Sequence, residues 1–511
     1  MPALVAFVFV ALPWLNPFSP GPTSSVGPFL FSWLCAALVL LALAVARQNG
    51  RIPAMVRAIA LAWLAAAGLN ALIGLLQYFA VTESFGVWLN HPQFGEAYGN
   101  LRQRNQFATL LNIGLLALLG LAASPDQPAL AWYRPPQPPG RLAFGLCMAA
   151  LLGCANAASS SRTGLLQLVL VLLMMLWWRQ GAESRHLKLP LLLTAVLAYA
   201  AASVALPLLA GLDPLGSGAL ARLRAGDPVC ASRLTLWSNV LHLIAQKPWL
   251  GWGWGELDYA HFITLYPGVR FCDILDNAHN LPLHLAVELG VPAALLICTA
   301  GLLLVWLGQP WRERDAIRQM AWGILAVMLL HSLLEYPLWY GPFQMAAALS
   351  VWLLCWVPRS GVRAYSYKVF RPLSLYSQAL IAMLLIAFCG FAAWNYHLAG
   401  QIYLAPEERA EAYRQDTLEK TRHVWLFQDQ VRFAELTLAE PNVGNALVMH
   451  ALALDMLHFS PEARVVEAVL DSALILGRRD EVAFFAKRFA QAFRADYVLW
   501  AQKNPAAVAS P

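Results

Sequence analysis

The sequence predicts an all-α, polytopic integral membrane protein with about 11 transmembrane helices, a large hydrophilic loop and a helical C-terminal region. Two observations support this prediction. The 511-residue chain is 59% hydrophobic and only 13% charged, whereas soluble domains carry about 25% charged residues. Uncharged apolar runs also recur, such as residues 29–46 and 189–210, and each is close to the roughly 20 residues that cross a bilayer as a helix.

The apolar segments give the expected spans in order. The first segment lacks the basic start and the small-residue cleavage site of a signal peptide, so we interpret it as a membrane helix. The expected spans are residues 3–15, 28–46, 58–80, 106–123, 142–158, 163–178, 189–210, 286–307, 320–338, 342–357 and 374–394.

Basic residues in the short loops predict the orientation. Alternate loops carry fifteen of them, whereas the opposite short loops carry only Arg102, Arg104 and Arg162. Because basic loops stay in the cytoplasm, we expect a bacterial inner-membrane protein with a cytoplasmic N-terminus and a periplasmic C-terminus. The fifteen residues are Arg47, Arg51, Arg57, Arg134, Arg141, Arg179, Arg185, Lys188, Arg312, Arg314, Arg318, Arg359, Arg363, Lys368 and Arg371. The net charge of +6 is thus spread over loops and does not indicate a nucleic-acid partner.

Four parts are expected from this topology: residues 1–210 with seven membrane helices, a periplasmic loop 211–285, four further helices in 286–394, and a periplasmic tail 395–511. In the tail the charges are denser and the apolar residues follow helical spacing, which predicts short paired helices similar to tetratricopeptide repeats. The expected tail helices are residues 407–415, 418–438, 445–458, 462–476 and 480–493.

Arginines on the periplasmic side oppose the predicted orientation. Arg104 and Arg162 lie almost at membrane ends, and Arg233 lies in the large loop with Arg222, Arg224 and Arg270. One interpretation is that these side chains reach out to lipid phosphates. The other is that they bind a substrate pyrophosphate, because the guanidinium fork matches phosphate oxygens.

The large loop ends in Asp276-Asn-Ala-His-Asn-Leu-Pro-Leu-His. Asp276, Asn277 or Asn280 could cap the helix that follows, and a proline suits its first turn. This places His279 at the mouth of the membrane, beside a helix N-terminus that favours anions. A histidine there could be a general base or a capping residue. His284 and Glu288, four residues apart, are expected to form a structural pair.

Further polar residues interrupt the ninth span. His331 and Glu335 lie one turn apart in an apolar segment, a costly placement that indicates an inward-facing polar site. Tyr336, Trp339 and Tyr340 follow them. Aromatic residues at this position suit either a membrane-interface belt or a sugar platform, and the same two interpretations apply to Trp252 and Trp254 in the loop.

No metal or cofactor is expected. The sequence has no Walker motif, no histidine pair at metal spacing and no Asp-x-Asp, and Asp273 with Asp276 is a weak candidate for a divalent ion. Arginines could stabilise a departing pyrophosphate instead. Cys230 and Cys272 are the two cysteines of the hydrophilic loop, so they form either a periplasmic disulfide or two free thiols.

These motifs resemble a known family. Asn277-Ala-His-Asn-Leu-Pro-Leu-His and His331-Ser-Leu-Leu-Glu-Tyr-Pro-Leu-Trp-Tyr are similar to motifs of the bacterial protein O-oligosaccharyltransferases, the pilin-glycosylation ligases within the O-antigen ligase and polymerase superfamily. Ser161-Arg-Thr-Gly, Ser232-Arg-Leu-Thr-Leu-Trp and Lys247-Pro-Trp-Leu-Gly-Trp-Gly-Trp-Gly resemble signatures of that superfamily, and the tail resembles that of the protein-glycosylating branch.

The resemblance implies an inverting, metal-independent transfer of a glycan from undecaprenyl pyrophosphate to Ser or Thr of a pilin-like or other periplasmic protein. By position, His279 matches the essential loop histidine and would be the general base, while Arg162 and Arg233, joined by Arg104, would bind the pyrophosphate. Gln167 and Tyr336 resemble important polar positions of the branch. We expect these two residues to line the substrate site with Asn280, Glu335 and Tyr340.

Two alternatives stay open. An O-antigen ligase would use lipid A–core as acceptor, and an O-antigen polymerase would use a second lipid-linked glycan. A transporter or flippase could use the same arginines without chemistry, but it would require charges near the bilayer midplane and alternating-access repeats. The sequence shows neither feature.

Overall fold

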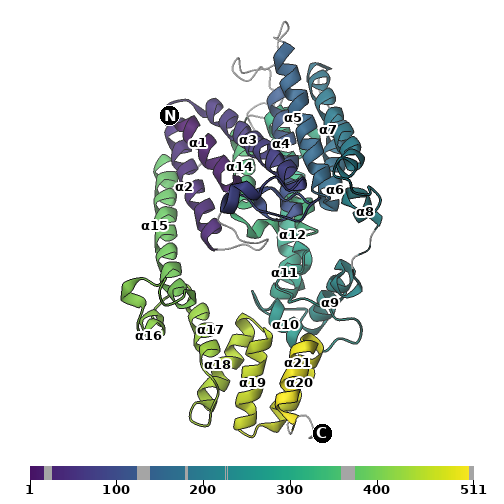
Figure 1. Cartoon of the computed structure of the whole chain (residues 1–511). Helices are drawn as coiled ribbons and strands as arrows, with labels where there is room; N and C mark the ends of the chain where they lie inside the picture. The colour runs from purple at the N-terminus through teal and green to yellow at the C-terminus, as the bar shows by residue number, and fades with distance from the viewer. Residues whose placement is uncertain are drawn as a thin grey trace. The chain divides into compact units, whose positions relative to one another are not determined.

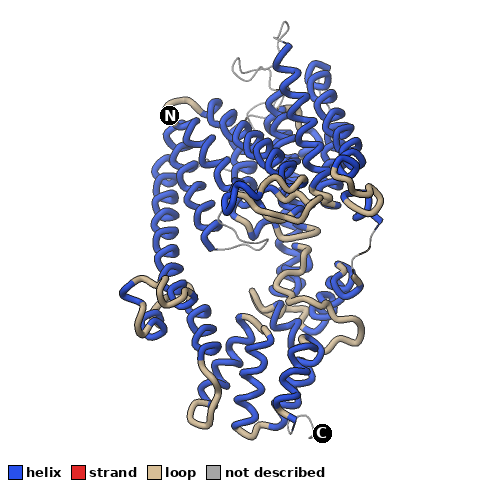
Figure 2. The backbone as a smooth tube through the Cα atoms, in the orientation of Figure 1, coloured by secondary structure: helices blue, strands red, loops and turns tan. Residues whose placement is uncertain are grey.

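The computed structural model describes residues 1–15, 26–123, 139–178, 182–224, 226, 228–357 and 374–505. Within these ranges every regular element is a helix (Figure 2), which confirms the all-α class. The chain divides into two compact units. The first contains Met1–Gly226 and Leu304–Gly390, and the second contains Asp227–Leu303 and Phe391–Pro511.

Apolar helices occupy all eleven positions where the sequence predicts spans (Figure 1). Six are long and apolar enough to cross a membrane, and five are shorter, so the chain is a polytopic membrane protein. The number of helices that cross the bilayer, and their orientation, stay predictions. The long helices are α2 (Val26–Gln48), α3 (Ile52–Tyr78), α4 (Arg104–Ala122), α7 (Ala182–Leu209), α12 (Val291–Gly308) and α15 (Leu375–Gly400). The shorter ones are α1 (Pro2–Ala11), α5 (Pro139–Ala158), α6 (Arg162–Trp177), α13 (Ala316–Ser332) and α14 (Gly341–Trp356).

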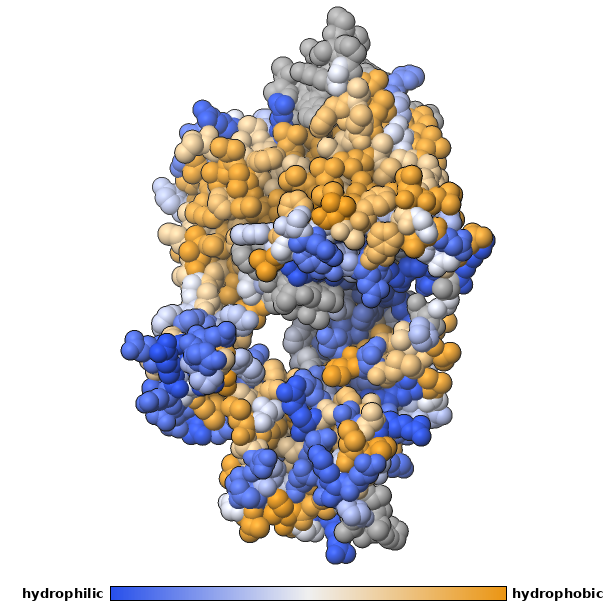
Figure 3. Space-filling model, viewed as in Figure 1, coloured by the Kyte–Doolittle hydropathy of each residue, from blue (hydrophilic) through white to orange (hydrophobic). Residues whose placement is uncertain are grey.

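Helix α4 forms the centre of the first unit. It contacts α3, α5, α6, α7 and α13, and 89% of its apolar stretch is buried, against 6% for α12. Glycines allow the helices of this bundle to approach closely. A Cβ atom on Gly114 would lie 2.2 Å from the Cβ of Ala67, and one on Gly153 would lie 2.2 Å from the Ala195 carbonyl oxygen. Much of the visible outer surface of the bundle is apolar (Figure 3), as a lipid-facing surface requires.

Some of the basic residues assigned to loops belong to helices. Arg47 lies in α2, Arg57 in α3, Lys188 in α7 and Arg318 in α13. The side chains of Lys188 and Arg318 are buried. For the other basic residues, the predicted loop position cannot be compared where the residue or its side chain lies outside the described part of the chain. These residues are Arg134, Arg179, Arg359, Arg363, Lys368 and Arg371, and the side chains are those of Arg141 and Arg185.

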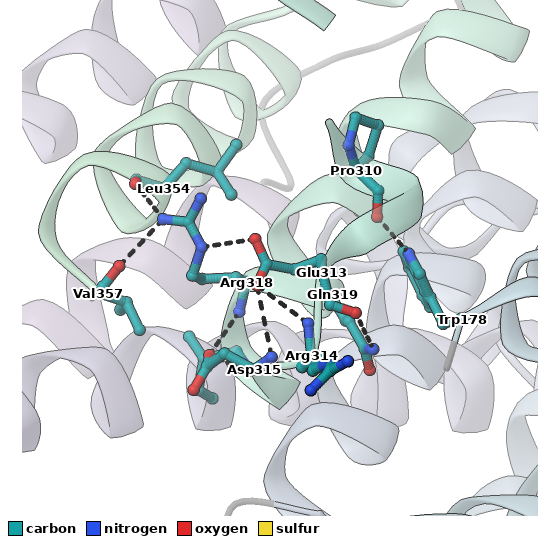
Figure 4. A network of polar contacts seen from close by, with 10 residues as sticks. Trp178, Pro310, Glu313, Arg314, Asp315, Arg318, Gln319, Leu354 and Val357 are labelled. Atoms are coloured by element: carbon teal, nitrogen blue, oxygen red, sulfur yellow. Dashed lines mark hydrogen bonds and ion pairs between the residues drawn. The ribbon is translucent and has the colours of Figure 1, made fainter. Parts of the chain in front are cut away.

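A buried polar network explains why Arg318 is tolerated at the start of α13 (Figure 4). Its Nε donates to Glu313 Oε2 at 2.7 Å, and its Nη1 donates to the carbonyls of Leu354 and Val357 at the end of α14. A cation at a helix C-terminus is favourable. Lys188 of α7 joins the network through Gln319, whose Nε2 donates to the Glu313 carbonyl. The network therefore ties α7, α13 and α14 together.

The second unit combines the large loop with the tail. Its loop helices are α9 (Arg233–Gln246), α10 (Leu257–Ile263) and α11 (Leu281–Leu289), followed by the first part of α12. Phe262 of α10 is part of the hydrophobic core of the tail helices. Arg488 donates to the Ile263 carbonyl at 2.6 Å, and His458 stacks on Tyr259. Helix α10 of the loop thus packs into the core of the tail, although the sequence separates the two segments.

The tail helices agree with the sequence prediction only in part. Three of the five predicted segments correspond to α18 (Ala446–Phe459), α19 (Ala463–Ile475) and α20 (Arg479–Ala492). The helix predicted at 407–415 is wrong, because only a short 3-10 turn (Glu411–Tyr413) forms there. The helix predicted at 418–438 is broken into α16 (Thr417–Thr421) and α17 (Gln428–Leu438), and α21 (Arg494–Lys503) was not predicted.

The Glu313–Arg318 pair should contribute strongly to stability. Glu313 is fully buried, so Glu313→Gln leaves a buried guanidinium without its counter-charge, which costs about 3–5 kcal/mol. We expect a clearly lower unfolding temperature for the purified protein in detergent. Arg312→Gln in the same turn changes an exposed side chain and should leave the unfolding temperature nearly unchanged. Equal unfolding temperatures for the two variants would contradict this role.

Candidate functional site

A polar cluster lies inside the apolar bundle of the first unit. Gln167 of α6 is 0% exposed, and its Nε2 donates to Thr109 Oγ1 at 2.8 Å and to the Val327 carbonyl at 3.0 Å. Its Oε1 accepts from Asn112 Nδ2 at 3.1 Å. The Nδ1 atom of His331 lies 2.9 Å from Thr109 Oγ1. Gln167 thus links α4, α6 and α13 through hydrogen bonds to other groups of the protein.

Asn105 extends this cluster toward the helix ends. Its Oδ1 accepts from Ser161 Oγ at 2.6 Å, and its Nδ2 donates to Glu335 Oε1 at 3.1 Å. The sequence analysis missed Asn105, Thr109 and Asn112. Their signal was present, because residues four and three apart lie on one face of a helix and these three are polar in an otherwise apolar segment.

The His331–Glu335 segment differs from the prediction. Helix α13 ends at Ser332, so Glu335 lies in the turn that follows and not on a helical face. His331 faces α4, and Glu335 lies at Asn105. Tyr336 and Tyr340 flank the 3-10 turn Pro337–Trp339 and stack with ring centroids 6.0 Å apart.

Arg162 begins helix α6. Ser161 is the N-cap, and its Oγ accepts from the Gly164 amide at 2.9 Å. Arg162 Nε donates to the Arg222 carbonyl at 2.8 Å. The first turn of a helix favours anions through its free amides and its dipole, so the guanidinium and the helix end together favour a phosphate.

Arg104 takes part in an internal ion pair. Its Nη2 donates to Glu96 Oε1 at 2.9 Å and to Tyr98 Oη at 2.7 Å, and Tyr98 also donates to Glu96. A phosphate would compete with Glu96 for this guanidinium. Arg104 therefore shares its positive charge with Glu96.

Arg233 repeats this local arrangement in the second unit. It begins α9, and Ser232 is the N-cap, whose Oγ accepts from the Thr235 amide at 3.2 Å. Ser-Arg at the start of a capped helix thus occurs twice, in α6 and in α9. In both places an arginine lies beside free backbone amides at the start of a helix.

His279 precedes α11 in a left-handed conformation, with φ of 49°. Asn280 is the N-cap and accepts from the Leu283 amide at 3.1 Å, while the His279 amide donates to Asn277 Oδ1 at 2.9 Å. Non-glycine residues with positive φ are uncommon and often occur at functional sites. Asn280 therefore has a capping role in addition to the predicted substrate contact.

Helix α11 is not the start of a membrane span. It ends at Leu289, and Gly290 (φ of 87°) separates it from α12, which starts at Val291. The expected span 286–307 therefore begins too early. His284 and Glu288 of α11 are both buried, and His284 Nε2 lies 3.5 Å from Glu288 Oε2. The predicted structural pair is confirmed.

The electrostatic setting distinguishes His279 from a second loop histidine. Burial raises the pKa of the Asp276 carboxyl, and the charge of nearby His279 opposes this shift. Burial lowers the pKa of His261 to about 3, helped by Arg270. The Nε2 atom of His261 lies 3.2 Å from the Phe271 carbonyl and its Nδ1 lies 2.8 Å from Tyr266 Oη. His261 is therefore a neutral structural link, and His279 is the better candidate base.

A disulfide joins Cys230 and Cys272, whose Cα atoms lie 5.2 Å apart. It connects the segment just before α9 to the segment that leads to His279. Among the described residues, no group of three or more His, Cys, Asp or Glu side chains could hold a metal.

The structure places the predicted site residues in two groups. The first unit contains Arg104, Arg162, Gln167, Glu335, Tyr336 and Tyr340. The second unit contains Arg233, His279, Asn280 and both loop cysteines.

Profiles of three protein families match the chain. The family described as protein glycosylation ligase matches residues 97–122, which include Arg104. The family described as O-antigen ligase matches residues 147–298, which include Arg162, Arg233 and His279. The family described as virulence factor membrane-bound polymerase, C-terminal, matches residues 319–507.

Two curated relatives come from Acinetobacter baylyi. A general O-oligosaccharyltransferase is 28% identical over 335 residues, which cover 63% of this chain and 54% of the relative. A ComP-specific O-oligosaccharyltransferase is 24% identical over 294 residues, which cover 57% of this chain and 49% of the relative. The chain thus spans about half the length of the curated relatives it matches. No solved structure gives a significant match.

The disulfide gives a direct test of the loop. In the chain-entropy model, closing a loop of about 40 residues constrains the unfolded chain by roughly 3–4 kcal/mol. Thiol labelling of denatured protein should modify the six free cysteines without reductant and all eight after reduction. In a Cys230→Ser control, Cys272 should become labelled without reductant. Labelling of all eight without reductant would rule out the bond, and labelling of the loop by a cytoplasm-restricted probe in cells would contradict the periplasmic placement.

Proposed function

We propose that this chain, which belongs to the O-oligosaccharyltransferase family within the O-antigen ligase superfamily, is a glycosyltransferase acting on a protein acceptor. The donor is a glycan on undecaprenyl pyrophosphate, and the acceptor is a Ser or Thr hydroxyl of a pilin-like or other periplasmic protein. One observation supports this best. Arg162, Arg233 and His279 lie at the starts of three capped helices, in the region that matches the O-antigen ligases.

The arginines bind the pyrophosphate of the donor. Arg162 and Arg233 each add a guanidinium to a helix N-terminus, so each can hold phosphate oxygens through two parallel N–H donors. Arg104 contributes positive charge but shares it with Glu96. As the glycan leaves, negative charge grows on the pyrophosphate, and fixed cations stabilise that charge without a metal ion.

His279 acts as the general base. Its imidazole accepts the proton of the acceptor hydroxyl while that oxygen attacks the anomeric carbon from the side opposite to the pyrophosphate. A C–O bond to the acceptor forms, the C–O bond to phosphate breaks, and the leaving pyrophosphate takes the electron pair. The configuration at the anomeric carbon is therefore inverted. The carboxyl of Asp276 lies within electrostatic reach of His279.

The polar cluster positions Arg162 within the first unit. Because Gln167 is fully buried and hydrogen-bonded within the bundle, we assign it a positioning role through α6. Tyr336 and Tyr340 form a stacked aromatic pair, which suits contact with a sugar face. We also expect substrate contacts from Glu335 and from Asn280.

A ligase or polymerase of O-antigen is the second candidate, because the O-antigen ligase and polymerase profiles match longer regions than the glycosylation ligase profile. The purified protein and a lipid-linked glycan should be incubated with a pilin-type protein, with lipid A–core, or with donor alone. Glycan on the pilin-type protein supports the proposal. Transfer only to lipid A–core, or polymer from donor alone, would replace it with the second candidate.

The base assignment predicts loss of transfer in two variants. His279→Ala removes the imidazole, and His279→Asn removes it with a residue that tolerates the left-handed backbone. Both should lose about 10²–10⁴-fold in transfer rate, the usual contribution of a general base, with normal abundance in the membrane. His423→Ala, at an exposed histidine of the tail, is the matched control. Near-normal transfer by well-expressed His279 variants would remove the base from the mechanism.

If these arginines bind the pyrophosphate, a positive charge alone should not be enough for donor binding and transfer. Arg162→Lys and Arg233→Lys keep the positive charge but lose the fork that binds two phosphate oxygens, so both should weaken donor binding and transfer. Arg224→Lys, at an exposed position of the short helix Gly218–Arg224, should retain full activity. Full donor affinity in both test variants would show that these arginines interact with lipid headgroups instead.

A further inference from the structure

Helix α9 has an apolar face that the protein does not cover. Leu236, Val240 and Leu243 point into the core of the loop. On the opposite face, Leu234 and Leu241 are exposed. They lie seven residues apart and therefore share one side of the helix. Figure 3 shows apolar surface in the part of the molecule where Figure 1 labels α9.

The turn after α9 continues this apolar surface. Trp249 and Leu250 are 76% and 85% exposed, which is far more than large apolar side chains usually show in water. Trp252 differs, because its Nε1 donates to the Leu243 carbonyl and Lys247 lies over its ring. The exposed side chains are thus Trp249 and Leu250, and Trp252 anchors the turn to α9.

Backbone contacts fix this turn against the start of α12. The Val291 amide donates to the Pro248 carbonyl at 2.8 Å, and the Trp252 amide donates to the Val287 carbonyl at 2.8 Å. Two glycines make the approach possible. A Cβ on Gly290 would lie 2.2 Å from the Trp249 carbonyl oxygen, and one on Gly251 would lie 2.3 Å from the Glu288 carbonyl oxygen.

Helix α12 supplies the reference for membrane position. It is a candidate span of which only 6% is buried inside the protein, and Leu295 and Leu296 in its first turns are exposed. These residues belong to the same compact unit as α9. Trp249 and Leu250 are therefore held beside the first residue of α12, a helix long and apolar enough to cross a membrane.

We propose that the exposed face of α9 and the Trp249–Leu250 turn are seated in the surface of the lipid bilayer. An amphipathic helix at this depth buries its apolar side chains among the headgroups and the upper acyl chains. Tryptophan is favoured at the membrane–water interface, and Lys247 can extend its charge into water. We assign the bilayer to this face because the Trp249–Leu250 turn packs against the start of α12, whose Leu295 and Leu296 are exposed.

This surface also sets the depth of Arg233, the first residue of α9, relative to the membrane surface. A helix seated at headgroup depth brings this arginine to the level of a lipid-linked pyrophosphate. This consequence rests on the proposed function, whereas the seating of α9 on the membrane does not.

The test uses the full-length protein in proteoliposomes of phosphatidylethanolamine and phosphatidylglycerol. A benzophenone amino acid replaces Leu241 or Leu250 in separate variants, and lipid adducts are measured by mass spectrometry after irradiation. The same substitution at Leu296, on α12, is the positive control. Val443, exposed in the turn before α18, is the negative control.

Lipid adducts at Leu241 and Leu250 should match those at Leu296 and exceed the background at Val443 several-fold. Adducts at Leu296 but only background at Leu241 and Leu250 would overturn the proposal. Irradiation of the same variants in cells gives a second arm, in which cross-links from Leu241 to protein without lipid adducts would also overturn it by indicating a protein partner. Adduct formation requires no transfer activity, so failure here is distinguishable from failure of the proposed glycosyltransferase.

Discussion

The pairing of polar side chains inside an apolar helix bundle is the constraint on which the first unit depends. A polar side chain at that depth must find its partner on another helix, because an unpaired one is costly. Gln167 therefore joins α6 to Thr109 of α4 and to the Val327 carbonyl of α13. These bonds fix how the three helices are rotated and shifted relative to one another, and Asn105 then holds Ser161 and Glu335 at their ends. The interior of the bundle thus sets the position of Arg162.

The same capping arrangement occurs at the starts of three helices. Ser161, Ser232 and Asn280 each accept an amide of the first turn, which leaves other amides of that turn facing outward. The residue beside each cap is Arg162, Arg233 or His279. A charged or titratable side chain is therefore presented next to a positive helix end in each case. Folding of each helix therefore also fixes where this side chain lies relative to the free amides.

Composition and apolar periodicity predicted the all-α class and the positions of the apolar helices, because the bilayer requires long uncharged segments. The sequence could not show that α13 ends at Ser332 or that Gly290 breaks the predicted 286–307 span, since both depend on contacts with distant residues. For the site, Asn280 was one of the three predicted cap candidates, whereas Ser161 was not predicted as a cap. The ion pair of Arg104 with Glu96, the burial of Gln167 and the neutral state of His261 come from tertiary packing, which local pattern does not encode.

The joint between the α9 turn and α12 is made by backbone atoms, with Gly251 and Gly290 facing carbonyl oxygens across it. This contact depends only on backbone atoms and on the lack of a side chain at the two glycines. The side chains of Trp249 and Leu250 take no part in this contact. Substitutions at these two positions would therefore change the exposed surface of the turn while the joint itself is kept by the two glycines.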